Sequence, residues 1–311
     1  MGPERSAATT SGRRWALGAA AFAALVLLVL GSSGVLDKVA FAVAWGMWVA
    51  VPLGLELASL GASSRRRLLA VWPLCALLGV LSFLGEIDAA WVGVLASLYL
   101  GFCLAVALVG ALELRRRFRQ PASVCSNLGL LLLPVAGAWH LAERMGWTVL
   151  GFSGLWAGLT AAHFHFAGFA TPILLSRGLF RAGGSSVRQW AEVALLALGV
   201  PSVALGITFS PVLALFGTAC MVLPIWSYAF GALRAKAGTG LVRLLRSLSA
   251  LVPLLTMSLA LAWSLSVVLR VSWLDLNQMI RYHGLANALG FISLGFAAEC
   301  LEPSRTDASN T

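Results

Sequence analysis

The densest group of side chains that could do chemistry in this sequence lies in one apolar segment. It contains His163 and His165, with Thr160 before them and Pro172 after them. Histidine gains or loses a proton between about pH 5 and 8 and also ligates metals. At about 100° per residue the two rings point to nearly opposite sides of a regular helix, so they cannot share one metal ion. Pro172 lacks the N–H that would pair with the Gly168 carbonyl, which predicts a helix break that presents an oxygen.

A second group follows near the C-terminal end, where His283 and Asn287 are four residues apart. This spacing places both side chains on one face of a helix. Arg281 and Tyr282 precede the pair, and we expect them to anchor the helix at the membrane surface. His140 closes another apolar run, and we expect it to be a solvated helix end.

Glu56 is the carboxylate that lies deepest within an apolar run, in the stretch VPLGLEL. Pro52 in the same stretch leaves the Trp48 carbonyl without its helical partner. A carboxylate in this position either bounds a polar site or extends its side chain to the membrane surface. The sequence leaves both interpretations open.

The elements that must position these residues are membrane-spanning helices. The 311 residues are 59% hydrophobic and 11% charged, with a mean hydropathy of +0.89, whereas about 25% of residues are charged in soluble domains. A span takes about 20 residues. The apolar runs predict ten spans, at 15–31, 39–61, 68–85, 89–112, 123–141, 154–176, 190–208, 211–232, 247–269 and 280–300.

The basic residues follow alternate connections between these spans. Of the 22 lysines and arginines, 18 fall in the two tails and the even-numbered connections, and the other four are Lys38, Arg144, Arg270 and Arg281. By the positive-inside rule the richer side is cytoplasmic, so both termini are predicted to be cytoplasmic. The net charge of +10 then reflects membrane topology, and we expect no nucleic-acid partner.

The predicted fold is therefore an all-α polytopic membrane helix bundle of about ten transmembrane helices. Residues 1–14 and 301–311 form cytoplasmic tails, and 15–300 form one membrane-embedded domain in the inner (plasma) membrane of the cell. Five isolated cysteines without a CxxC pair indicate packing residues rather than a disulfide or zinc framework. We predict no cofactor, and the oligomeric state is left open.

Depth along the helices groups the polar residues. At 1.5 Å per residue, His140 and His283 lie ~25 Å from the cytoplasmic ends, His163 and Asn287 ~20 Å, and His165 ~18 Å. Because an isolated polar group in lipid is unfavourable, we expect these groups to share a cavity. The predicted cavity residues are His163, His165, His283, Asn287, Glu56 and Thr160. The sixth and tenth spans must then touch, and the glycines expected at that contact are Gly158, Gly168, Gly284 and Gly290.

Three functions fit this pattern. The first is a transporter of a small molecule or ion, with histidines that can couple it to protons. The second is a membrane-embedded metal or haem protein with histidine ligands, which the spread of the four histidines disfavours. The third is a non-catalytic membrane assembly partner, in which each imidazole only bonds to a neighbouring helix. Catalysis is not indicated by any motif.

Two stretches also resemble a known family. TAAHFHFAGF at Thr160–Phe169 and MIRYHGLANALGF at Met279–Phe291 are similar to signature stretches of the YndJ-like family of bacterial polytopic membrane proteins, and VPLGL at Val51–Leu55 is a weaker match. The resemblance implies a multi-span protein of a family usually described as transporters, without an assigned substrate. The family motif positions in this sequence are His163, His165, Gly168, Phe169, His283, Gly284, Asn287, Gly290 and Phe291.

Overall fold

The computed structural model describes residues 3–235 and 238–302, and the only regular elements in those ranges are helices, apart from an isolated bridge between Val149 and Phe152. This confirms the predicted all-α class. In chain order the elements are α1 (Pro3–Ser32), α2 (Lys38–Trp45), η1 (Gly46–Ala50), α3 (Val51–Leu57), α4 (Ala62–Leu81), η2 (Ser82–Leu84), α5 (Ala90–Arg117), α6 (Pro121–Arg144), α7 (Gly154–His163), η3 (Phe164–Ala170), α8 (Thr171–Ala182), α9 (Val187–Phe209), α10 (Pro211–Arg234), α11 (Gly240–Leu269), α12 (Leu276–Gln278), η4 (Met279–Leu285), η5 (Asn287–Ser293) and α13 (Leu294–Leu301).

Nine helical segments in the described ranges are long and apolar enough to cross a membrane. They correspond to all the expected spans except the sixth. The sixth is also helical, because α7, η3 and α8 follow one another from Gly154 to Ala182, but its two histidines make it more polar. The protein is therefore a polytopic membrane helix bundle. The expected tail 1–14 overlaps α1, which begins at Pro3, whereas residues 303–311 of the other expected tail lie outside the described residues.

The second span lies at the centre of the bundle. In its most apolar stretch, within Lys38–Leu57, 72% of the residues are buried, compared with 22% for the first span, Gly12–Ser32. Large apolar side chains such as Phe22, Leu108 and Leu255 are exposed on the outside of peripheral helices. Such a surface is unfavourable in water, and it is the surface that a lipid bilayer requires.

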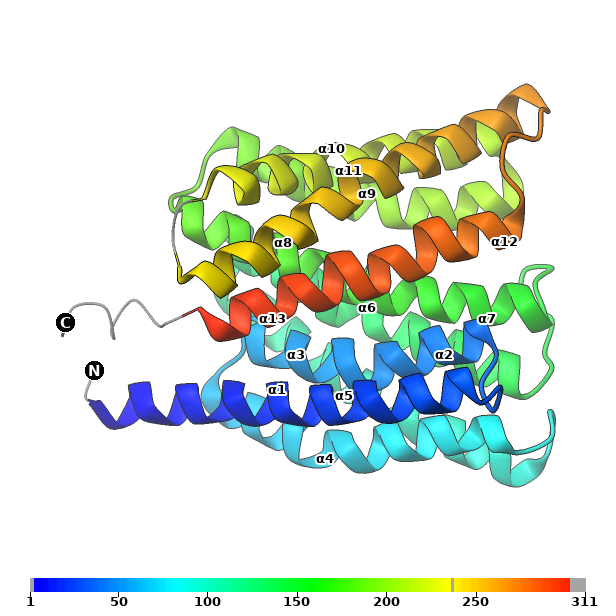
Figure 1. Cartoon of the computed structure of the whole chain (residues 1–311), viewed down its shortest axis with the longest axis horizontal. Coiled ribbons are helices and arrows are strands. Elements are labelled where there is room, and N and C mark those ends of the chain that lie inside the picture. The colour runs from blue at the N-terminus through cyan, green and yellow to red at the C-terminus, as the bar shows by residue number, and fades with distance from the viewer. Residues whose placement is uncertain (1–2, 236–237, 303–311) are drawn as a thin grey trace.

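The long helices run side by side, and α1 begins at the same end of the bundle where α13 ends (Figure 1). The Arg13 guanidinium donates a hydrogen bond to the Glu302 carbonyl at 3.2 Å, which joins the first helix to the end of the last. The short connections that follow α3, α5 and α8 lie at this end as well. They contain or adjoin the arginines that the charge pattern groups together. We call this end the basic end and the other the opposite end.

The charge pattern predicts that the basic end is cytoplasmic. In a variant without native cysteines, Asp88→Cys lies in the α4–α5 connection at the opposite end, and Arg116→Cys lies at the exposed end of α5. A membrane-impermeant thiol reagent added to intact cells should label the first and spare the second. Labelling of Arg116→Cys alone would reverse the assigned orientation.

Prolines in the second and sixth spans leave the helices continuous, contrary to the predicted breaks. A π-helical turn precedes each proline: η1 ends just before Pro52, and η3 ends just before Pro172. In these turns Val51 N–H donates to the Gly46 carbonyl and Thr171 N–H to the Phe166 carbonyl, each five residues back. The wider turn makes room for a ring that would clash with the preceding turn of a regular helix.

The tenth span has two further π-helical turns, η4 and η5, without any proline. Within the described residues, π-helical turns therefore occur only in the second, sixth and tenth spans. These three spans also contain the six residues predicted to line a cavity. Turns of π-helix are rare in proteins as a whole, but many of those that occur lie at functional sites. Their location is therefore a second, independent reason to look for the site in these three spans.

Candidate functional site

A cavity of about 430 Å³ is lined by residues of the sixth and tenth spans, of α9, α10 and α11, and of the start of α2. It reaches from Lys38, Pro211 and Leu276, which begin their helices at the opposite end, to Thr171 and Ile292 deeper in the bundle. Three of the polar residues singled out from the sequence line this cavity: His163, His283 and Asn287. These three side chains of the sixth and tenth spans thus border one cavity, and its role as a functional site stays a prediction.

Hydrogen bonds to α11 fix the two polar residues of the tenth span. His283 Nδ1 lies 2.8 Å from the Thr256 carbonyl, and the Thr256 hydroxyl donates to Asn287 Oδ1 at 2.7 Å. Because a carbonyl oxygen only accepts, His283 Nδ1 must bear the proton. In the neutral ring, Nε2 is then an acceptor without a partner among the described residues. Asn287 Nδ2 lies 3.4 Å from Nδ1 and retains donors that can face the cavity.

His163 is half-buried and has no hydrogen-bond partner in the described part of the chain. Its neighbour in sequence, Phe164, meets it edge-on at 6.1 Å between ring centroids. Both ring nitrogens are therefore available to whatever occupies the cavity. This is the difference between His163 and the other histidines, each of which has a protein partner.

His165 points away from the cavity and is fully buried. Its Nε2 lies 2.7 Å from the Tyr99 hydroxyl, and its Nδ1 lies 2.8 Å from the Ala161 carbonyl. The rings of His165 and Tyr99 stack, with 5.8 Å between their centroids. A Cβ at Gly46 would lie 2.7 Å from the His165 side chain, so this glycine lets η1 pack against the histidine. Tyr99 comes from α5, and the sequence interpretation missed it because nothing in its local pattern distinguishes it from an apolar neighbour.

His140 is 1% exposed, so the expectation of a solvated helix end is wrong. The α4–α5 connection folds over the end of α6, and Ser82 in η2 lies 3.1 Å from His140 Nε2. Arg144 reinforces this closure by donating to the carbonyls of Ser82 and Gly85.

Thr160 and Glu56 lie outside the lining of the cavity. The Thr160 hydroxyl donates to the Trp156 carbonyl in its own helix, which satisfies it locally. Glu56 lies near the basic end, 5% exposed, with Oε2 3.7 Å from the Arg65 guanidinium. A Cβ at Gly12 would lie 2.9 Å from Glu56 Oε1, so the carboxylate faces the first helix.

The glycines expected between the sixth and tenth spans contact other helices. Gly158 packs against Val39 of α2, and Gly290 packs against Val252 of α11. A Cβ added at either glycine would lie 2.8 Å from the valine side chain. Gly168 faces Leu132 of α6 and its own helix, and Gly284 has open space. The close approach is made by Gly295, where a Cβ would lie 2.7 Å from Leu174 of α8. The small-residue pattern could not distinguish among several neighbouring helices.

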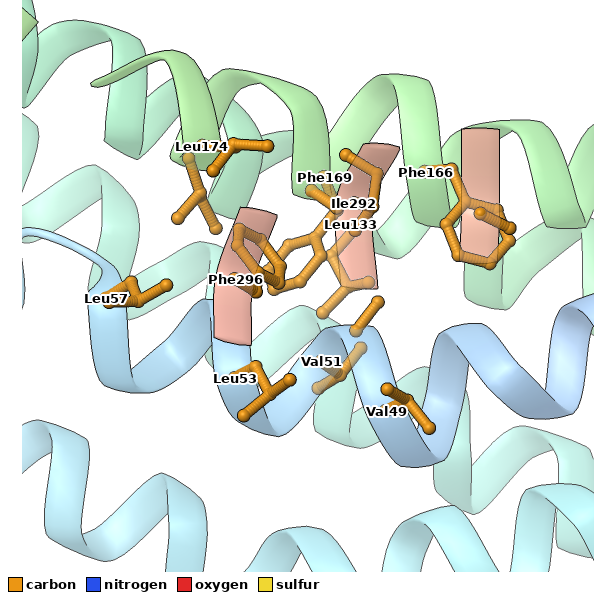
Figure 2. Close-up of a cluster of buried hydrophobic side chains, with 14 of the residues drawn as sticks. Val49, Val51, Leu53, Leu57, Leu133, Phe166, Phe169, Leu174, Ile292 and Phe296 are labelled. Atoms are coloured by element: carbon orange, nitrogen blue, oxygen red, sulfur yellow. The ribbon is translucent and has the colours of Figure 1, made fainter. Parts of the chain in front are cut away.

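An apolar layer lies where the second, sixth and tenth spans meet. Figure 2 shows the side chains of Phe169, Ile292 and Phe296 packed between the second and sixth spans, with Leu133 and Val51 beside them. All five are nearly or fully buried. Ile292 also lines the cavity, so this layer adjoins the deep end of the cavity.

Beyond this layer, a buried carboxylate joins three helices at the basic end. Glu299 of α13 is 1% exposed and forms ion pairs with Arg177 and Arg181 of α8 and with Arg246 of α11. Glu302 adds pairs to Arg181 and Arg246, the latter at 3.0 Å. The sequence interpretation missed this cluster because Glu299 lies at a predicted span end, where a carboxylate is unremarkable.

Comparison with known proteins identifies the family. A model of YndJ-like proteins matches residues 41–291. The chain belongs to the YndJ-like family. Over 258 residues it is 30% identical to the membrane protein YndJ of Bacillus subtilis (strain 168). The aligned region covers 78% of this chain and 44% of that relative. The chain thus spans less than half the length of this YndJ relative, and no solved structure matches it.

The region matched by the YndJ-like model contains both histidine groups. His163 and His283 line the cavity, whereas His165 and His140 lie with Tyr99 on the other side of the sixth span. Within the described ranges, no three histidine, cysteine or acidic side chains come together as a metal site would require. The four histidines therefore do not lie together as one set of metal ligands.

Proposed function

We propose that this YndJ-like protein is a transporter of a small molecule or ion in the bacterial inner membrane. The cavity lined by His163, His283 and Asn287 is its substrate site. One observation carries the proposal: the cavity reaches residues at the opposite end of the bundle, whereas its deep end adjoins a buried apolar layer. A substrate site that faces one side at a time is what alternating access requires.

The proposed inner barrier has two parts. The apolar layer around Phe169 and Phe296 excludes water, and the ion pairs of Glu299 hold α8, α11 and α13 together at the basic end. Opening toward the basic end requires both to separate. The sixth and tenth spans contribute to both the cavity and the barrier, so a relative movement of these two spans would open one side as it closes the other.

Protons are the proposed coupling ions. The free Nε2 of His283 and the unprotonated ring nitrogen of His163 can each accept a proton. Protonation would place positive charge in a mostly apolar space, which changes the free energy of substrate binding. Glu56 and His165 are not assigned to this step, because their partners are Arg65 and Tyr99 rather than the cavity.

Thiol accessibility tests the proposal on both sides of the membrane. In a variant without native cysteines, Ser264→Cys lies on the cavity wall, and Ser258→Cys is the control on the exposed face of the same helix. Ser249→Cys lies at the barrier, where the native hydroxyl donates to the Phe291 carbonyl. An impermeant reagent added at the opposite end should label Ser264→Cys but not Ser258→Cys, because a thiol in lipid stays protonated.

The same reagent added at the basic end should label Ser249→Cys as the barrier opens. Labelling of Ser264→Cys without any labelling of Ser249→Cys would mean that the cavity opens to one side only. That result would contradict transport.

A further inference from the structure

The walls of the cavity restrict the charge of its occupant. None of the described lining residues is acidic. The one lysine, Lys38, is exposed at the rim, where its ammonium group donates to Asn277 Oδ1 at 3.0 Å. With His163 and His283 neutral, a charged molecule placed deep in the cavity would lose its hydration without meeting an opposite charge, which is strongly unfavourable. The cavity therefore favours an uncharged occupant.

The body of the cavity is apolar and partly aromatic. Trp156, Phe166 and Trp263 contribute rings, and Met221, Met257 and Met279 contribute flexible thioethers. Methionine side chains adapt their shape to an apolar ligand. A volume of about 430 Å³ accommodates a small organic molecule rather than a bare ion.

The polar groups are few and lie where one head group could meet them. His283 Nε2 accepts a hydrogen bond, because Nδ1 donates to the Thr256 carbonyl. Asn287 Nδ2 donates, because Oδ1 is occupied by the Thr256 hydroxyl. A hydroxyl group both donates and accepts, so it satisfies the histidine and the amide together.

From these three features we infer that the cavity binds an uncharged, largely apolar molecule with a hydroxyl head group, placed against His283 and Asn287. The inference rests on the proposed function, since it assumes that this cavity is the working site. It goes further by excluding small ions, sugars and charged amphiphiles as the main substrate. Such molecules would need either a fixed countercharge or many more hydrogen-bonding groups in the wall.

Three probes with one ring system and different head groups test the inference. Naphthylethanol, naphthylacetate and naphthylethylamine are uncharged, anionic and cationic at neutral pH. Equilibrium binding to the full chain in lipid nanodiscs, corrected with empty nanodiscs, should favour the alcohol over either ion by about tenfold or more. His283→Ala and Asn287→Ala should each weaken binding of the alcohol, because each removes a hydrogen bond to its hydroxyl group. Ser258→Ala, on the lipid-facing side of α11, should leave it unchanged.

Each other outcome overturns the inference. Equal or tighter binding of the acid or the amine shows that a charge is accepted. Equal binding of all three shows an apolar cleft that a lipid chain could fill as well. If no probe binds although Ser264→Cys is labelled from the opposite end and Ser249→Cys from the basic end, the substrate class is wrong and the proposed transport stands. If both cysteines are inert, the proposed function fails first.

Discussion

Replacing Glu299 by glutamine is expected to lower the free energy of unfolding by about 3 kcal/mol. The carboxylate is 1% exposed and is shared by Arg177, Arg181 and Arg246. Glutamine keeps the shape but removes the negative charge that offsets these cations. The Arg177 and Arg181 side chains are 25% and 23% exposed, so water screens part of their charge. We therefore expect a loss of stability at the lower end of the range for buried ion pairs.

The matched control is Glu302→Gln, three residues further along. Glu302 pairs with Arg181 and Arg246, but its side chain is 21% exposed, and we expect a loss of about 1 kcal/mol or less. Unfolding of the purified protein in mixed micelles, followed by far-ultraviolet circular dichroism against denaturant concentration, gives both values. If the two variants are equally stable, Glu299 does not hold the three helices together.

The spans could be predicted from the sequence because the bilayer imposes a simple rule on them. Lipid contact requires long apolar helices, and the arginine-rich connections alternate with the others, so length and charge gave the same count. The π turns could not be predicted in the same way. Pro52 and Pro172 indicate a disturbed helix, but whether the chain breaks or widens depends on packing around it, such as Gly46 against His165.

Two of the predicted cavity residues lie on one helix face, so the sequence alone places them together. His283 and Asn287 are four residues apart, and both line the cavity. Partners from distant helices could not be derived in this way. Thr256 fixes the tenth span and Tyr99 binds His165, yet neither differs locally from residues that only pack. Glu56 was expected near the cavity from its depth alone, whereas its direction around the helix places it beside Arg65.

The central claim is that His163, His283 and Asn287 face water in a cavity rather than dry packing. Radiolysis of water by X-rays produces hydroxyl radicals that oxidise methionine next to bound or bulk water. Met257 lines the cavity although it is only 8% exposed, and Met47 is fully buried in the core, where its carbonyl accepts a hydrogen bond from Trp72. Met145, at the opposite end, is partly exposed and serves as the reference for free access.

The most direct measurement is therefore the rate of oxidation of each methionine in the unmodified protein in nanodiscs, read by mass spectrometry after increasing X-ray exposure. The cavity predicts that Met257 is oxidised at a rate close to that of Met145 and far above that of Met47. Protection of Met257 equal to that of Met47 would show that the space beside His283 is dry. In that case neither the substrate site nor the transport proposed for it would stand.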